Sequence, residues 1–164
     1  MTPLPSGGEE VPLARLFARG LRALIDELHE RLARRGWPDV RPFLGFALLA
    51  VRDGDRDGED PATVVSLAGL LGVTKQAASK LVTSLEDAGH VRRVAHGSDG
   101  RAKALTLTAR GADLLATVEE IYAEIEAEWA AVLGGDRVDG IRCDLLHVLR
   151  ATHDGALPPV RPTW

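Results

Sequence analysis

Two short helical segments joined by a three-residue connection constrain the fold of this chain most strongly. Thr63 precedes a run of apolar residues and is a good N-terminal cap, and Gly72 ends the run where a left-handed backbone is tolerated. Thr74 then caps a second segment that we expect to stay helical to about Ala88. Ala68 and Gly72 are small enough for the two helices to cross closely at a steep angle. The pattern predicts a helix-turn-helix.

The second of these helices has an apolar face and a polar face when its residues are placed about 100° apart. The apolar face is expected to hold Ala77, Leu81, Leu85 and Ala88, with Ala78 and Val82 at its flanks. The opposite face carries hydroxyls, one amide and two lysines, at Lys75, Gln76, Ser79, Lys80 and Thr83. The acids, at 86–87, stand in the last turn, where the helix dipole disfavours them. A polar N-terminal half is typical of a helix that reads DNA, although a solvated face is the plainer interpretation.

A β-hairpin is predicted directly after this helix. Two β-type segments, 91–95 and 102–108, are joined by a link that contains Asp99 and Gly100, a strong hairpin turn signal. Arg101 stands at the tip, and a narrow minor groove attracts arginine through its negative potential. Lys103 follows in the second strand, where it would anchor the hairpin on DNA. A hairpin with a purely structural role remains the alternative.

Positive charge gathers in this same part of an acidic chain. The window 74–110 holds seven Lys or Arg and three Asp or Glu, a net charge of +4, whereas the whole chain carries −4. All three lysines of the chain fall inside the window, which chance could also produce. A local basic patch on an acidic body favours binding of a polyanion such as double-stranded DNA. RNA is a weaker alternative, because the window holds no aromatic residue on which a base could stack.

Helical periodicity marks four further segments outside the basic window. We expect helices over 12–35, 42–52, 109–133 and 136–153, with an acidic, glycine-rich loop from Asp53 to Pro61. The aspartates of this loop alternate as in a calcium loop, but no glutamate stands at the closing position, so we expect no calcium there. Apolar stripes on the first and last helices are too wide for the small central lobe to cover. They predict a homodimer.

The 164 residues are expected to form a single domain that is mainly α with a small β-hairpin wing. We expect a flexible tail at 1–11, the domain at 12–153 and an extended tail at 154–164. Within the domain, a winged helix-turn-helix lobe spans 63–110, and N- and C-terminal dimerisation helices span 12–35 and 109–153.

Several classes of protein are disfavoured by what the sequence contains. No apolar run approaches the ~20 residues that span a bilayer, and the first residues do not resemble a signal peptide, so we expect a cytoplasmic protein without a membrane partner. Cys143 is the only cysteine, so no internal disulfide forms, and we expect it to be packed in the last helix rather than a redox sensor. The catalytic, phosphate-loop and metal-ligand motifs are missing, which predicts a protein that is not an enzyme and has no cofactor or metal site.

Three stretches of this sequence resemble the MarR family of bacterial winged helix-turn-helix transcriptional regulators. They are 65–93 (VSLAGLLGVTKQAASKLVTSLEDAGHVRR), the wing at 98–103 and the segment 107–111. The segment 36–42 (GWPDVRP) is similar to a subgroup of the family. The resemblance covers roughly 12–150 and keeps the order of elements, and its wing is the most specific part.

The resemblance implies a homodimer that binds a pseudo-palindromic operator, with two recognition helices in successive major grooves and Arg101 in the flanking minor grooves. It also implies release of DNA when a small aromatic ligand binds between the dimerisation helices and the winged lobe, or when a cysteine is oxidised. Trp37, Phe43 and Phe46 are candidates to face such a ligand, although aromatic residues at helical spacing more often belong to the core. His90 departs from the aliphatic or aromatic residue usual in the family, and we expect little effect from it.

The predicted function is that of a DNA-binding transcription regulator, in the form of a homodimeric repressor released by a small-molecule effector. Thr74 and the polar face of the second helix would contact DNA together with the wing. The alternative is a winged-helix module that binds another protein and has no sequence-specific affinity for DNA. An intact basic face and wing favour the regulator, because an adaptor would need neither.

Overall fold

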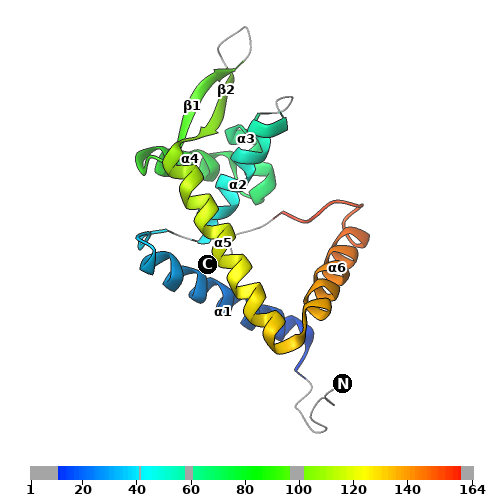
Figure 1. The fold of residues 1–164 in the computed structure, drawn as a ribbon. Helices are drawn as coiled ribbons and strands as arrows, with labels where there is room; N and C mark the ends of the chain where they lie inside the picture. Colours follow the sequence, from blue (N-terminus) through cyan, green and yellow to red (C-terminus); the bar gives the residue numbers. More distant parts are fainter. Residues whose placement is uncertain (1–10, 41, 58–60, 97–101, 160–164) are drawn as a thin grey trace.

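The computed structural model describes residues 11–40, 42–57, 61–96 and 102–159. The helices are α1 (Leu13–Arg34), α2 (Pro42–Asp57), α3 (Val64–Leu71), α4 (Lys75–Asp87), α5 (Ala109–Leu133) and α6 (Gly135–Ala151), and the strands are β1 (Val91–His96) and β2 (Ala102–Leu107). A winged lobe forms one end of the molecule, and α5 runs from it to the other end, where it contacts α1 and α6 (Figure 1). The mainly helical fold with a hairpin wing is confirmed.

The helix-turn-helix forms because each of its ends is capped as the sequence predicts. The Thr63 side chain accepts a hydrogen bond from the Ser66 amide, and Ser66 Oγ accepts one from the Thr63 amide, which makes a reciprocal capping box at the start of α3. Gly72 ends α3 with φ at 60°, a left-handed conformation that a side chain would strain. The Thr74 hydroxyl oxygen then accepts a 3.2 Å bond from the Ala77 amide at the start of α4.

The wing is a two-stranded antiparallel sheet in which Val91 lies opposite Leu107 and Ala95 lies opposite Lys103. The Leu105 amide donates a 2.8 Å bond to the carbonyl of Ala62, so β2 is also attached to the segment that leads into α3. Residues 97–101 at the tip lie outside the described part of the chain. The sheet is therefore fixed to the helix-turn-helix on one side.

The core lies where α2 passes through the winged lobe and meets α5. Its largest fully buried side chains come from α1 to α5 and from β2: Leu28, Leu32, Leu48, Val51, Leu67, Leu71, Val82, Leu85, Leu105, Leu114 and Ile121. The winged lobe and the first turns of α5 therefore share one core, so the position of α5 determines that of the lobe.

Helix α2 is longer than the sequence analysis predicts, because it continues to Asp57 instead of ending near Arg52. The expected acidic loop is therefore helical over 53–57, and 58–60 lie outside the described residues. Gly54 favours a loop in isolation, yet its α-carbon packs against the segment before α3. A Cβ there would lie 2.5 Å from the Ala62 amide nitrogen. This glycine serves a close approach of backbones within a helix, not a turn.

The buried face of α4 is rotated relative to the predicted one. Ala78, Val82 and Leu85 are buried, Leu81 is half-buried, and Ala77 and Ala88 are exposed. Exposure of an alanine methyl costs little, whereas exposure of a leucine or valine costs roughly 25 cal/mol per Å² of apolar surface, so the large side chains set the rotation.

The outer helices leave apolar side chains uncovered in the single chain. Those of α1 include Leu13, Leu16, Phe17 and Leu21, and those of α6 include Ile141, Leu145 and Val148. No residue of α6 is buried, so Cys143 is exposed, and the expectation that it is packed in the chain is wrong. Cys143 is exposed because α6 packs mainly against α5, which leaves the rest of its surface uncovered in the single chain. None of the described helices is long and apolar enough to cross a membrane.

Candidate nucleic-acid interface and adjoining cavity

The polar face of α4 is open to solvent along the first three turns of the helix. Lys75, Gln76, Lys80 and Thr83 are exposed and Ser79 is half-buried, so the structure places the predicted contact residues of α4 on one surface. Thr74 differs from them because its hydroxyl oxygen caps the helix. It would meet DNA only with the hydrogen atom of that hydroxyl. The face carries lysine and neutral polar groups near the positive end of the helix dipole, which suits an anionic ligand.

A hollow in the surface joins this face of α4 to the wing. It lies among α3, α4 and the two strands and is lined by Thr63, Val64, Val65, Lys75, Ser79, Arg93 and Lys103. Lys103 is exposed there, and Arg101 lies outside the described residues. Arg93 was missed by the sequence analysis as a contributor to this surface, since only the pairing of the strands brings it beside Lys75 and Lys103.

The acidic end of α4 also has a structural partner. Arg93 Nη2 lies 3.2 Å from a carboxylate oxygen of Glu86, so α4 and β1 are joined by an ion pair. This ion pair offsets the unfavourable interaction of Glu86 with the helix dipole in the last turn of α4. It keeps the negative charge of Glu86 neutralised beside the basic surface.

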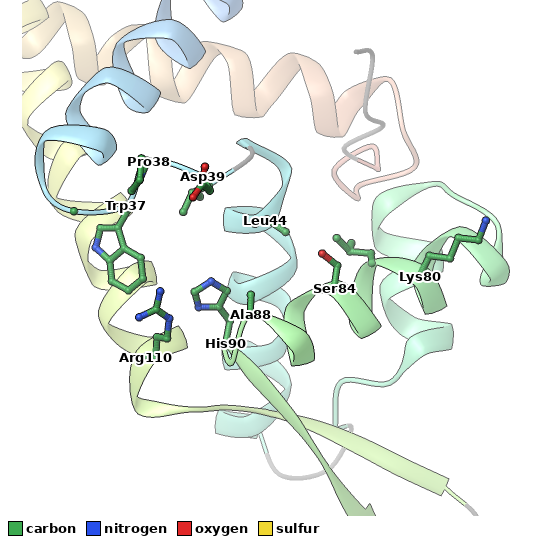
Figure 2. A pocket seen from close by; sticks show the side chains of 12 residues that line it. Trp37, Pro38, Asp39, Leu44, Lys80, Ser84, Ala88, His90 and Arg110 are labelled. Atoms are coloured by element: carbon green, nitrogen blue, oxygen red, sulfur yellow. The ribbon is translucent and has the colours of Figure 1, made fainter.

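A cavity of about 690 Å³ lies on the other side of α4, between the helix-turn-helix and the segment that links α1 to α2. Figure 2 shows its principal lining residues, which are Trp37, Pro38, Asp39, Leu44, Lys80, Ser84, Ala88, His90 and Arg110. Of the aromatic residues predicted to face a ligand, the structure brings only Trp37 to this cavity. Phe46 packs against the core, and the side chain of Phe43 lies outside the described residues. The cavity is large enough for a small organic molecule.

His90 and Arg110 meet Trp37 in the wall of the cavity (Figure 2). The Arg110 guanidinium carbon lies 4.8 Å from the centre of the Trp37 ring, a cation–π contact, and the His90 ring centre lies 5.9 Å from it. His90 is only 4% exposed, and its Nδ1 atom is buried without a hydrogen-bond partner among the described residues. The structure thus places His90 in the wall of this cavity, whereas the expectation that it has little effect stays a prediction. Sequence reasoning missed it because the approach of α5 creates the site.

Residues 108–111 hold His90 in place through backbone contacts. The Thr108 hydroxyl donates a 2.6 Å bond to the Gly89 carbonyl, and the Thr108 amide donates a 3.0 Å bond to the His90 carbonyl. The same hydroxyl oxygen accepts the Gly111 amide at 3.0 Å and so caps α5. An added Cβ at Gly111 would lie 2.0 Å from the His90 carbonyl oxygen, so only glycine permits this approach.

Burial lowers the pKa of His90 below its ordinary value of 6.5, and the nearby positive charge of Arg110 lowers it further. The unfolded chain therefore binds a proton at a pH where folded His90 does not. The free energy of unfolding should not depend on this group above about pH 6.5. Below that pH the protonation of His90 in the unfolded chain should lower it by at most about 1.4 kcal/mol per pH unit. Urea unfolding at pH 7.5 and 5.5 measures the loss. His90→Gln should lose less over the same interval, and an equal loss would contradict the assignment.

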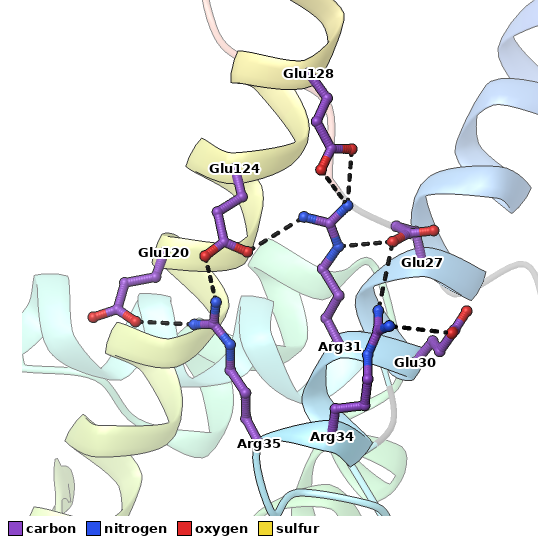
Figure 3. A network of polar contacts seen from close by, with 8 residues as sticks. All are labelled: Glu27, Glu30, Arg31, Arg34, Arg35, Glu120, Glu124 and Glu128. Atoms are coloured by element: carbon purple, nitrogen blue, oxygen red, sulfur yellow. Dashed lines mark hydrogen bonds and ion pairs between the residues drawn. The ribbon is translucent and has the colours of Figure 1, made fainter.

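Two arginines, Arg31 in the last turn of α1 and Arg35 just after it, bind the acidic face of α5 (Figure 3). Arg31 contacts Glu27, Glu124 and Glu128 at 2.7, 3.3 and 2.7 Å, and Arg35 contacts Glu120 at 3.0 Å and also pairs with Glu124. The Arg35 hydrogen bond, helped by Arg31, lowers the pKa of Glu124. These pairs fix the angle between α1 and α5, and their partial exposure keeps the contribution of each modest.

Comparison with known proteins shows that this arrangement is similar to that of winged helix-turn-helix proteins. Residues 47–102 match the sequence model of the MarR family. The fold is similar to apo MarR from E. coli, with 24% identity, 86% of this chain and 99% of that chain covered, and a TM-score of 0.65. It is also similar to an S. aureus MepR–DNA complex, with 20% identity, 89% and 100% covered, and a TM-score of 0.69.

MepR of S. aureus bound to ethidium bromide is a third similar structure, with 20% identity, 89% of this chain and all of that chain covered, and a TM-score of 0.58. Among curated proteins, none matches the sequence significantly. The class defined by the fold and the basic face is the winged helix-turn-helix. The match to the MarR family model covers residues 47–102 of the chain, and the solved structures named above share its fold.

Proposed function

We propose that the chain acts as a homodimeric repressor of a pseudo-palindromic operator and that a small-molecule effector in the cavity releases the DNA. One observation carries the proposal. Helix α4 presents Lys75, Gln76 and Thr83 to solvent on one side and lines the cavity on the other. Lys80 and Ser84 line both the cavity and a separate hollow on the exposed face of α4, which Gln76 and Thr83 also line. A ligand that displaces α4 therefore has a direct mechanical route to the DNA-contacting face.

Contacts with DNA would divide between two parts of the lobe. Gln76 and Ser79 would reach base edges in the major groove, where amides and hydroxyls read hydrogen-bonding groups. Lys75, Lys80 and Lys103 would contact phosphates, and Arg101 would enter the minor groove at the wing. The DNA-bound structure of S. aureus MepR, which has the same fold, supports this use of the lobe.

Dimerisation is supported by the uncovered apolar side chains of α1 and α6. In Figure 1, α1 and the start of α6 lie near the end of α5 that is away from the winged lobe, where a second copy could cover these helices and leave both lobes free. A two-fold dimer presents two copies of α4 and so favours an operator with inverted half-sites.

Effector binding is supported by the mixed lining of the cavity, in which apolar walls stand beside a few polar groups. The ethidium-bound structure of S. aureus MepR adds that a protein of this fold takes up an aromatic molecule. In the chain, Trp37 offers a ring face to an aromatic effector.

The alternative, a winged-helix module that binds another protein, draws little support from the acidic surface. The carboxylates of Glu120, Glu124 and Glu128 are already paired with arginines of the same chain, so they are poorly available to a basic partner.

Selection of genomic fragments by the purified protein at ~150 mM salt tests the function, since non-specific affinity is weak at such salt. Footprinting of the selected fragments should reveal an inverted repeat with half-sites about one helical turn apart. The protein should first be refolded to remove any bound ligand. No enrichment over random DNA after that step would contradict the proposal and favour the protein-interaction module.

Loss of one phosphate-region cation should weaken operator binding and flatten its dependence on salt. Lys75→Ala and Arg101→Ala are each expected to make the plot of the log of the binding constant against log salt concentration less steep by about 0.9, the value for one lost phosphate contact. Filter binding between 50 and 200 mM salt measures the slope. Arg137→Ala removes an exposed cation of α6, which lies apart from α4 in Figure 1, and should leave the slope unchanged. An unchanged slope in a test variant would contradict its assignment.

A further inference from the structure

We infer that the ion pair between Glu86 and Arg93 limits the affinity of the chain for DNA other than its operator. Glu86 holds the Arg93 guanidinium until a DNA strand is seated between α4 and the wing, and Arg93 then exchanges the carboxylate for a phosphate. The inference rests on the proposed binding of an operator and adds a determinant of its specificity.

Three cations surround the hollow that joins α4 to the wing. Lys75 is the first residue of α4, and Arg93 and Lys103 come from the two strands. In the strand register Arg93 lies opposite Leu105, two residues from Lys103. The two cations are therefore diagonal neighbours on one face of the sheet, roughly 7–8 Å apart. Like charges at this spacing repel each other, so the hollow favours an anion.

The shape and lining of the hollow suit a stretch of DNA backbone. Its volume is about 420 Å³, more than one phosphate group fills. Val64 and Val65 of α3 add apolar surface beside the cations, and Val65 is 61% exposed in the free chain. Protein contacts with the DNA backbone go to sugars as well as to phosphates. Apolar surface next to cations therefore fits alternating sugar and phosphate better than it fits a free inorganic anion.

Glu86 contacts Arg93 from outside the hollow. A carboxylate oxygen of Glu86 lies 3.2 Å from Arg93 Nη2, and the side chains of Arg93 and Glu86 are 31% and 29% exposed. Glu86 is not among the described residues that line the hollow, whereas Arg93 is. A guanidinium has five N–H donors on a flexible stem, so rotation about the side-chain bonds can turn it from the carboxylate to a phosphate.

The exchange depends on how closely a phosphate approaches. A partly exposed ion pair contributes a factor of about five at most to an equilibrium constant, so a phosphate hydrogen-bonded at about 2.7–2.9 Å can replace the Glu86 carboxylate. Non-specific DNA binding is a diffuse electrostatic attraction. Because the hollow is recessed between α4 and the wing, a phosphate reaches Arg93 only when both elements are docked. Arg93 then adds a contact to the operator complex and leaves non-specific complexes without it.

Filter binding of a mixed-sequence duplex between 50 and 200 mM salt tests the inference. Glu86→Gln frees Arg93 for non-specific contacts. The plot of the log of the binding constant against log salt concentration should become steeper by about 0.9, the value for one added phosphate contact, and the affinity should rise by about fivefold. Glu86→Ala also removes the carboxylate and should give the same result, so the test does not depend on the folding of one variant.

Two neighbouring arginines of β1 provide matched backgrounds for Glu86→Gln. In Arg93→Ala the substitution of Glu86 should no longer change the slope. Arg92→Ala removes an exposed cation on the other face of the strand, and there the full effect of Glu86→Gln should persist. An ion pair that only joins α4 to β1 would instead change the urea unfolding of Glu86→Gln and leave its slope equal to that of the parent chain.

Two results would overturn the inference alone: an unchanged slope in both Glu86 variants, or the same increase in the Arg93→Ala background, which would trace the effect to net charge. Failure of the proposed regulator is distinguishable, because genomic fragments would then show no enrichment while the mixed-sequence duplex still binds and still responds to Glu86→Gln. Absence of any binding to the duplex would overturn both.

Discussion

Alanine in place of Gly111 is expected to lower the free energy of unfolding by about 3 kcal/mol or more, at the upper end of overpacking substitutions. The added Cβ would lie 2.0 Å from the His90 carbonyl oxygen and 2.9 Å from its carbonyl carbon. Backbone atoms cannot move aside as a flexible side chain can, so the start of α5 must shift away from β1. That shift would also break the bonds of Thr108 to the carbonyls of Gly89 and His90.

Urea unfolding followed by circular dichroism measures the effect of Gly111→Ala, and two other helical glycines supply matched controls. A Cβ at Gly45 would lie 3.6 Å from Val118 Cγ1, an ordinary contact, and one at Gly69 would meet nothing within 4 Å. Alanine has the better helix propensity by up to about 1 kcal/mol, so these two variants should be as stable as the parent chain or more stable. A Gly111→Ala protein as stable as its controls would contradict the close approach.

The helical elements could be predicted from the sequence wherever local signals decide them. Thr63, Thr74 and Thr108 are caps whose partners lie three residues away, and Gly72 ends a helix through its own backbone. Gly54 could not be interpreted in the same way. Its role depends on Ala62, which lies in a different element, so glycine composition indicated a loop where the chain continues a helix.

The polar face of α4 was predictable for the same reason, since helical periodicity alone assigns it. The cavity was not, apart from Trp37. His90 follows the end of α4 and Arg110 stands in the first turn of α5, and no spacing in the sequence links either of them to the segment 36–40. Only the packing of α5 against the lobe brings them beside Trp37. Cys143 was misjudged because a single chain leaves α6 uncovered.

The acidic surface of α5 shows a pairing that periodicity could have suggested. Glu120, Glu124 and Glu128 recur every four residues, and so do Arg31 and Arg35, so two helices that lie side by side can match the two series. The sequence analysis did not match the two series, because the arginines lie about 90 residues earlier in the chain. Complementary series of equal spacing in distant helices are therefore a usable signal for helix packing.

The uncovered apolar faces of α1 and α6 lead to a second large expected effect, on self-association. Phe17→Asp should convert the proposed dimer to monomer, with a rise in the dimer dissociation constant on the order of 10³-fold or more. Phe17 is 53% exposed in the single chain and stands beside Leu13, Leu16 and Leu21. A carboxylate buried there would cost several kcal/mol, and a two-fold interface contains the substitution twice.

Sedimentation velocity over a range of protein concentrations measures this association. Leu70→Asp provides the control, because Leu70 is similarly exposed but lies on α3 in the winged lobe. It should remain dimeric. The monomeric Phe17→Asp protein should keep its helical content, since Phe17 is not among the described residues that pack against the buried core, yet it should bind a full inverted repeat hardly better than a single half-site. A Phe17→Asp protein that stays dimeric would show that α1 lies outside the interface and would leave α6 as the helix that a partner must cover.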